Sequence, residues 1–178
     1  MLMPDQATVI LVMGVSGCGK SSVATELVDR IGGRLIEGDA FHPPENIARM
    51  AAGQPLDDAM RGPWLDRIAS EITALQKAGG SPIVVACSAL KRAYRDRLRS
   101  AARAMRILCL VGSEDVLRQR LETREGHFIK ADLLASQLAT LEVPGPDEGA
   151  RVIDIDQPID AIIDRFLEKS ANSPVDGF

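Results

Sequence analysis

Five short apolar runs alternate along the chain with longer segments in which apolar residues recur every three or four positions. The runs cover residues 9–13, 34–37, 83–87, 107–111 and 151–155. Short continuous runs of this kind are typical of strands that are buried on both faces. The longer segments have helical periodicity, and one apolar stripe extends from Trp64 to Leu75. Strands that alternate with helices predict an α/β fold, in which helices cover both faces of a parallel sheet.

Residues that begin or end helices occur at the expected places. Gly32 can end the helix that follows the first run, and Ser113 is a suitable N-cap for a later helix. Further helices are predicted over residues 90–102, 133–141 and 159–167. Two segments, 40–63 and 124–142, interrupt the alternation, and we expect them to be a substrate-covering insertion and a lid.

Length and charge are those of one globular domain spanning residues 1–178. The formal net charge of −4 disfavours a general nucleic-acid-binding protein, which would be basic. The first residues lack the basic and apolar regions of a signal peptide. No run approaches the roughly 20 apolar residues of a membrane span. Three cysteines without metal-ligand spacing fit a reducing compartment. We therefore expect a cytoplasmic protein that binds neither nucleic acid nor a membrane.

A glycine-rich basic loop follows the first apolar run and contains the pattern G-x-x-x-x-G-K-S. Its glycines allow successive backbone N–H groups to face one centre and to approach phosphate oxygens closely. Lys20 adds charge for the terminal phosphates, the Ser21 hydroxyl can ligate Mg²⁺, and the next helix directs its positive dipole end at the same point. The residues predicted to line this site are Gly14, Val15, Ser16, Gly17, Cys18, Gly19, Lys20, Ser21 and Ser22.

Two other nucleotide-binding classes fit this loop poorly. A dinucleotide fingerprint would use Asp39, about 20 residues downstream, but it requires glycine at the position of Ser22 and has no use for Lys20. A regulatory GTPase would carry a D-x-x-G switch far downstream and an N-K-x-D base-reading motif. The D-x-x-G of this chain lies at residues 29–32, inside the first predicted helix, and N-K-x-D is absent. The loop therefore indicates a phosphate cradle that does not belong to a switch GTPase.

Carboxylates follow the second predicted strand, at the edge of the sheet where ligands bind. Asp39 could accept the proton of an acceptor hydroxyl and orient it for in-line attack on the terminal phosphate. The alternative is a solvated loop residue or a helix cap. Glu37 could hold Mg²⁺ through water, or could be an ordinary strand-end carboxylate.

Histidines and basic residues lie in the segments around the same edge. His42 and His127 each flank a phenylalanine in a glycine- or proline-rich loop, which favours hydrogen bonding to a polyol. Basic residues there could clamp an anionic substrate, although about half of them are expected to be solvated. Arg120 and Arg124, four positions apart, suit neutralisation of a phosphoryl group in transfer. The basic set comprises Arg49, Arg61, Lys91, Arg92, Arg95, Arg120 and Arg124.

Several longer motifs make the chain resemble the gluconate kinase family, small P-loop enzymes that phosphorylate D-gluconate to 6-phospho-D-gluconate. The resemblance extends from about residue 9 to residue 158. Its motifs are MGVSGCGKS at 13–21, GDAFHPPENIARM at 38–50, GQPLDD at 53–58, RGPWL at 61–65, CSALKRAYRDRLR at 87–99, REGHF at 124–128 and DIDQP at 154–158. General P-loop kinases share the first motif only, so the combination of the others is distinctive.

The resemblance implies a three-layer P-loop kinase fold, like that of nucleoside and shikimate kinases, with a five-stranded parallel sheet of order 2-3-1-4-5. It implies ATP and Mg²⁺ as cofactors, gluconate as substrate and a cytoplasmic homodimer. Asp39 would activate the acceptor hydroxyl, and Lys20 with Arg124 would contact the phosphates. Ser21 and Glu37 would be the metal contacts.

Further site residues are implied by matching motif positions. The sugar acid would contact Asp39, His42, Arg49, Arg61, Lys91, Arg95 and His127. Outside the phosphate loop, the nucleotide would contact Arg120, Asp156 and Pro158, with residues 154–158 beside adenine.

The chain departs from the family pattern at the substrate cover and at the second metal contact. Ala59 and Met60 stand where aspartate is typical, and Gly62 replaces a larger residue. Glu37 stands where aspartate is expected, which lengthens any link to Mg²⁺. Two other functions remain open, namely another small-molecule kinase of the shikimate type and a nucleotide-binding regulator without transfer activity.

Overall fold

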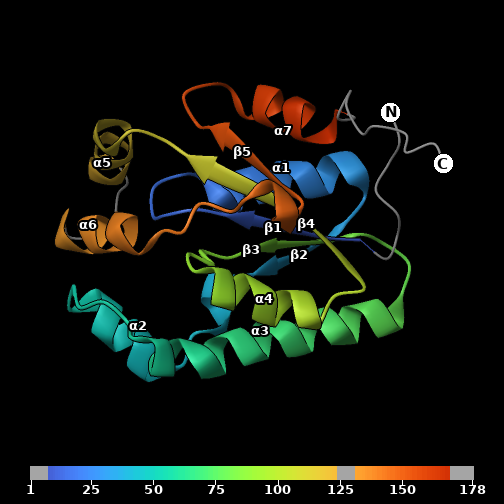
Figure 1. The fold of residues 1–178 in the computed structure, drawn as a ribbon, viewed down its shortest axis with the longest axis horizontal. Coiled ribbons are helices and arrows are strands. Elements are labelled where there is room, and N and C mark those ends of the chain that lie inside the picture. Colours follow the sequence, from blue (N-terminus) through green and yellow to red (C-terminus); the bar gives the residue numbers. More distant parts are fainter. Residues whose placement is uncertain (1–7, 124–130, 169–178) are drawn as a thin grey trace.

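Five parallel strands form one sheet in the order β2-β3-β1-β4-β5, which confirms the expected order (Figure 1). The computed structural model describes residues 8–123 and 131–168. The strands are β1 (Thr8–Met13), β2 (Arg34–Glu37), β3 (Ile83–Ala86), β4 (Ala104–Val111) and β5 (Ala150–Asp154). At the centre of the sheet, Val12 is in register with Ala86 of β3 and with Leu108 of β4. Because all strands are parallel, their carboxyl ends meet at one edge.

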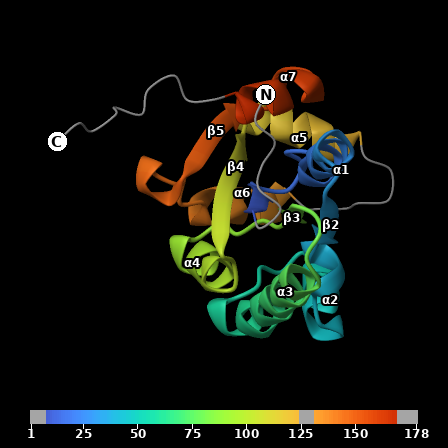
Figure 2. The same ribbon diagram turned by 90° about the vertical axis from the view of Figure 1, so that its right-hand side faces the viewer.

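Helices cover both faces of the sheet, as the alternating pattern predicts (Figure 2). α1 and α7 lie on one face and α3 and α4 on the other, whereas α2, α5 and α6 gather near the carboxyl edge. The α-helices are α1 (Lys20–Ile31), α2 (Pro44–Ala51), α3 (Asp58–Ala78), α4 (Arg92–Ser100), α5 (Glu114–Glu122), α6 (Ala131–Thr140) and α7 (Ile159–Leu167). Two short 3₁₀ helices are η1 (Gly38–Phe41) and η2 (Pro146–Glu148). In the described parts of the chain, no helix is both long and apolar enough to span a membrane.

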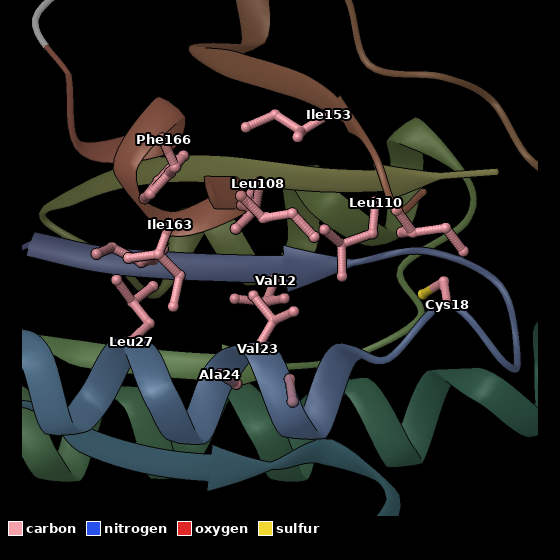
Figure 3. Packing of buried hydrophobic residues seen from close by; sticks show 14 of the residues in the cluster. Val12, Cys18, Val23, Ala24, Leu27, Leu108, Leu110, Ile153, Ile163 and Phe166 are labelled. Atoms are coloured by element: carbon pink, nitrogen blue, oxygen red, sulfur yellow. The ribbon is translucent and has the colours of Figure 1, made fainter. Parts of the chain in front are cut away.

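The central strand separates two hydrophobic clusters. Val12 faces the first cluster, in which Leu27 of α1 packs with Ile163 and Phe166 of α7 (Figure 3). Leu11 points the other way, into a cluster beneath α3 and α4. Each residue of β1 beyond Thr8 is fully buried. Since a strand alternates its side chains between faces, a continuous apolar run is what a strand between two helix layers requires.

Predicted helix boundaries are confirmed where they depend on local chemistry. Gly32 ends α1 in the left-handed conformation with φ +69°, and the Ser113 hydroxyl accepts a hydrogen bond from the Val116 amide at the start of α5. The segment 40–63, which we expect to cover the substrate, is partly helical. It contains η1 and α2, and α3 begins at Asp58, before Pro63, where the Asp57 carboxylate caps the Met60 amide.

Candidate active site

The phosphate loop follows β1 at the carboxyl edge of the sheet. Gly14 and Gly17 have φ angles of +147° and +84°. A Cβ on Gly14 would lie 2.6 Å from the Leu110 carbonyl oxygen, and one on Gly17 would lie 2.9 Å from Cγ of Leu121. Both the backbone conformation and the close contacts therefore require glycine at these two positions. The result is a loop whose backbone can surround a phosphate group.

The interior of the loop presents donors for an anion. Lys20 begins α1, and its Nζ folds back to donate to the Val15 carbonyl at 3.2 Å. The first turn of α1 carries no acidic side chain, so its positive dipole end is uncompensated there. Cys18 is 1% exposed and points into the first hydrophobic cluster, so its thiol serves packing (Figure 3).

Gln137 of α6 reaches the same loop. Its Oε1 accepts a hydrogen bond from the Ser16 amide at 2.7 Å, across 121 positions of sequence. One of the loop amides therefore already has an oxygen partner, in the kind of contact that a phosphate oxygen would make.

Arg120 lies between the phosphate loop and the turn after β5. Its Nη2 donates to the Ile155 carbonyl at 2.8 Å, and its Nη1 lies 3.8 Å from the position of a Cβ on Gly19. The turn itself is ordered by the Asp154 carboxylate, which accepts from the Asp156 amide at 2.7 Å. Pro158 is the N-cap of α7. Arg120 thus links the turn after β5 to the neighbourhood of Gly19 in the phosphate loop.

Glu37 ends β2 and Asp39 follows it, at the same edge of the sheet as the phosphate loop. Burial raises the pKa of the Cys87 thiol to about 12, and the charges of Asp39, Glu37 and Lys20 all act on that thiol. Asp39 lies in η1, and its side chain is 71% exposed. An exposed carboxylate at the edge of the sheet that carries the phosphate loop can meet a hydroxyl that arrives from solvent. Across residues 8–123 and 131–168, no group of three or more His, Cys, Asp or Glu side chains could hold a metal ion.

His42, in the segment after β2, is held by stacking. Its ring lies on Trp64 with centroids 4.1 Å apart and an angle of 14° between the planes. The Trp64 Nε1 donates to the Gly38 carbonyl at 2.7 Å, which ties α3 to the residue before Asp39. Burial lowers the pKa of His42, and its Nε2 lies 4.0 Å from Oδ1 of Asp39.

An open cavity of about 510 Å³ with charged and apolar lining residues lies between the start of α3, the segment after β3 and the end of α6. The Lys91 Nζ donates to both Asp58 carboxylate oxygens, at 2.8 and 2.9 Å. The Tyr94 hydroxyl also donates to Asp58 and accepts from Nη1 of Arg61 at 3.1 Å. The hydrogen bonds from Lys91 and Tyr94 lower the pKa of Asp58. The hydrogen bond to Asp58 raises the pKa of Lys91. The lining residues are Leu56, Asp57, Asp58, Ala59, Arg61, Lys91 and Thr140.

Comparison with known proteins agrees with this arrangement. The AAA domain family matches residues 9–144. The gluconokinase of Gluconobacter oxydans (strain 621H) is 46% identical over 158 residues, which are 89% of this chain and 88% of the relative. The chain belongs to the gluconokinase family. The thermoresistant gluconokinase of Escherichia coli (strain K12) is 41% identical over 161 residues, covering 90% and 91% of the two chains. The crystal structure of a gluconokinase from Sinorhizobium meliloti 1021 superposes with a TM-score of 0.82 at 44% identity, covering 92% and 91%.

One residue that the family resemblance assigned to substrate is placed elsewhere. Arg95 is 1% exposed, and its Nε and Nη2 donate to the Glu148 carboxylate at 2.6 and 2.8 Å. Its Nη1 faces the carbonyl oxygens of Ala89, Leu90 and Glu142. Ala89 has a φ of +41°, so Arg95 holds a strained turn after β3. Because Arg95 is buried and its guanidinium pairs with Glu148 and with backbone carbonyls, it is not placed to bind a sugar acid, and we withdraw that assignment.

Other predicted residues of this gluconokinase-family chain lie outside the cavity or outside the described residues. Arg49 is exposed on α2, and its Nε donates to the Pro55 carbonyl at 2.9 Å. Arg92 pairs with Asp147 at 2.7 Å on the surface. Arg124 and His127 fall outside the described residues.

Sequence reasoning missed two contacts at this site. Asp58 belongs to the quoted GQPLDD motif, but nothing in the motif indicates that its carboxylate binds Lys91 and Tyr94. Gln137 lies in a predicted helix and carries no motif, so its contact with Ser16 had no sequence signal.

Proposed function

We propose that this protein transfers the terminal phosphoryl group of ATP to the 6-hydroxyl of D-gluconate. The identity of 41–46% with two gluconokinases over about nine-tenths of both chains carries this proposal. The site adds chemical support, because a phosphate loop and a cavity with two cationic side chains lie at the same edge of the sheet.

The residues divide into three roles in this proposal. The phosphate-loop amides and Lys20 hold the triphosphate, with Lys20 exchanging the Val15 carbonyl for phosphate oxygens. Arg120 and residues 154–158 contact the nucleotide, with Asp156 and Pro158 beside adenine. In the cavity, Arg61 and Lys91 bind the sugar carboxylate by charge-assisted hydrogen bonds. Arg49, Arg124 and His127 keep the ligand roles that the family resemblance implies.

Asp39 is the proposed base for the acceptor hydroxyl. As the 6-oxygen attacks the terminal phosphorus, a new P–O bond forms and the bond from phosphorus to the bridging oxygen of ADP breaks. The hydroxyl proton passes to the Asp39 carboxylate and then to solvent. Positive charge from Lys20 stabilises the phosphoryl oxygens during transfer.

Mg²⁺ fits the donors at this site. Ser21 in the first turn of α1 and Glu37 at the end of β2 offer a hydroxyl and a carboxylate oxygen, which suit this ion. Two protein donors match a Mg²⁺ that takes its other ligands from phosphate and water. When bound, the ion neutralises charge on the phosphates.

We also propose that the protein is cytoplasmic and works as a homodimer. Light scattering of the purified protein tests the oligomeric state.

A coupled assay with ATP and Mg²⁺ tests the proposed reaction. ADP release should depend on D-gluconate, and ³¹P NMR should find a phosphomonoester at C6. Shikimate, other aldonates and nucleoside monophosphates serve as competing acceptors. Phosphorylation of shikimate in place of gluconate would favour the other kinase class, and ATP binding without any acceptor turnover would favour a nucleotide-binding regulator.

A further inference from the structure

Asn46 of α2 is a buried polar residue that none of the roles above uses. It is 1% exposed. Its Nδ2 donates to the Met60 carbonyl at 3.1 Å and lies 3.3 Å from Nδ1 of His42. A buried amide in contact with both a backbone carbonyl and a site histidine restricts how that histidine can carry its proton.

The Met60 carbonyl decides the orientation of the Asn46 amide. A carbonyl oxygen accepts hydrogen bonds and cannot donate, so the group facing it must be the NH₂ and not the amide oxygen. The second hydrogen of the same NH₂ is then available to Nδ1 of His42, which has to accept it. An imidazole whose Nδ1 accepts, and which is neutral, carries its proton on Nε2.

The ring of His42 is fixed with Nε2 toward Asp39. Stacking on Trp64 holds the ring plane, and the Trp64 hydrogen bond to Gly38 holds the backbone next to Asp39. Nε2 lies 4.0 Å from Oδ1 of Asp39. Burial lowers the pKa of His42 most strongly, Asp39 raises it and Arg61 lowers it, and the net direction is down from the ordinary value of 6.5. This direction favours the neutral ring at pH 7.

We propose that Asn46 and His42 are positioning residues, which keep the Nε2–H of neutral His42 directed at one oxygen of the Asp39 carboxylate. The other oxygen is then left for the acceptor hydroxyl. The opposite tautomer would turn an Nε2 lone pair toward the carboxylate and repel it. This inference rests on the proposed role of Asp39. It replaces the expectation that His42 binds the sugar, since the side chain is 5% exposed and both ring nitrogens already face protein groups.

Imidazole ¹⁵N NMR of the unmodified protein tests the tautomer without any assay of activity. The chain has two histidines, so the spectrum of His127→Gln assigns His42. At pH 7.5 we expect a protonated Nε2 and an unprotonated Nδ1. Asn46→Asp should move the proton to Nδ1, because a carboxylate accepts only. A proton on Nδ1 in the unmodified protein, or a doubly protonated ring, would overturn the inference whichever acceptor the enzyme uses.

Kinetics test the consequence for transfer. Asn46→Asp should lower kcat about 10-fold to 100-fold while KM for ATP stays within about threefold. His42→Gln keeps a donor at the place of Nε2 and should retain most of kcat, whereas His42→Ala should lose as much as Asn46→Asp. Equal loss in the two His42 variants would contradict the positioning role. In an Asp39→Asn background, Asn46→Asp should have no further effect on kcat. Absence of gluconate phosphorylation by the unmodified protein would instead refute the proposed function.

Discussion

Arg95 and Glu148, separated by 53 positions, form a two-bond ion pair inside the protein, with Nε–Oε2 and Nη2–Oε1 distances of 2.6 and 2.8 Å. The pair joins α4 to η2, and Arg95 also reaches the Ala89 carbonyl in the strained turn after β3. It therefore stabilises the segment that precedes Lys91, a residue that lines the cavity.

Replacing one partner of this pair should cost much more stability than breaking a surface pair. Glu148→Gln leaves the Arg95 charge buried without a counter-ion, and we expect the free energy of unfolding to fall by about 3–5 kcal/mol. Asp66→Asn is the matched control, because it breaks the exposed pair with Arg97 and should cost less than about 1 kcal/mol. Urea denaturation measures both. Equal losses would mean that the Arg95–Glu148 pair is not a buried ion pair in solution.

The same pair predicts a dependence of stability on pH. The hydrogen bond from Arg95 holds the pKa of Glu148 below its ordinary value of 4.5. Between the lowered pKa of Glu148 in the folded protein and its ordinary pKa in the unfolded chain, the unfolded chain binds more protons than the folded one. The free energy of unfolding therefore rises with pH in this range. The contribution is complete above pH 4.5 and is lost as the pH falls through the lowered folded value. Glu148→Gln, compared with the unmodified protein across this range, should lack that contribution; parallel pH curves would contradict the assignment.

Asp39→Asn tests the proposed base. Without a carboxylate to accept the hydroxyl proton, kcat should fall about 10²-fold to 10⁴-fold, while ATP binding stays near that of the unmodified protein. Steady-state assay and calorimetry measure the two effects. Asp29→Asn makes the same change on the exposed side of α1 and should leave kcat unaltered. An unchanged kcat in Asp39→Asn would remove Asp39 from its role.

Gln137→Glu tests whether α6 and the triphosphate share the phosphate loop. The new carboxylate would lie where Oε1 now accepts from the Ser16 amide, and its charge would oppose the phosphates. We expect KM for ATP to rise about 10-fold, which corresponds to about 1.4 kcal/mol. The control, Gln76→Glu, adds the same charge near the end of α3. This helix end precedes the amino end of β3 and so lies at the edge of the sheet opposite the phosphate loop. A similar rise in the control would point to net charge instead of the local contact.

Lys91→Met tests recognition of the sugar carboxylate. Loss of a charge-assisted hydrogen bond of about 1.5–3 kcal/mol should raise KM for gluconate roughly 10-fold to 100-fold, with KM for ATP unaffected. The control is Lys77→Met, an exposed lysine in the last turn of α3. If KM for gluconate does not change, the carboxylate binds elsewhere.

Strands and helices that depend on residues close together in the sequence could be predicted. The apolar runs located all five strands, although β4 begins at Ala104, before the apolar run, because its first residues pair with Thr8 and Val9 of β1. The apolar stripe located this helix from Trp64 onward, but the cap from Asp57 begins α3 at Asp58. The predicted ends of helices and strands are wrong in this way because strand pairing and helix capping extend an element beyond the residues whose own pattern predicts it.

Partner choice between distant residues was not predictable. The family motifs place Arg95 among substrate residues, yet Glu148 lies close enough to take its guanidinium. Asn46 gives no sign in sequence that it meets both Met60 and His42. Such contacts depend on how the segments after β2 and β3 fold over the sheet edge.

The linear chain alone thus determined the strand and helix alternation and the phosphate loop, because periodicity and glycine spacing act over a few residues. The tertiary structure decided which cationic side chains are buried and which line the cavity. Arg95 became buried against Glu148, while Arg61 and Lys91 line the cavity. The reason is that a long cationic side chain can reach several partners, and only the packing of remote elements decides which carboxylate lies nearest.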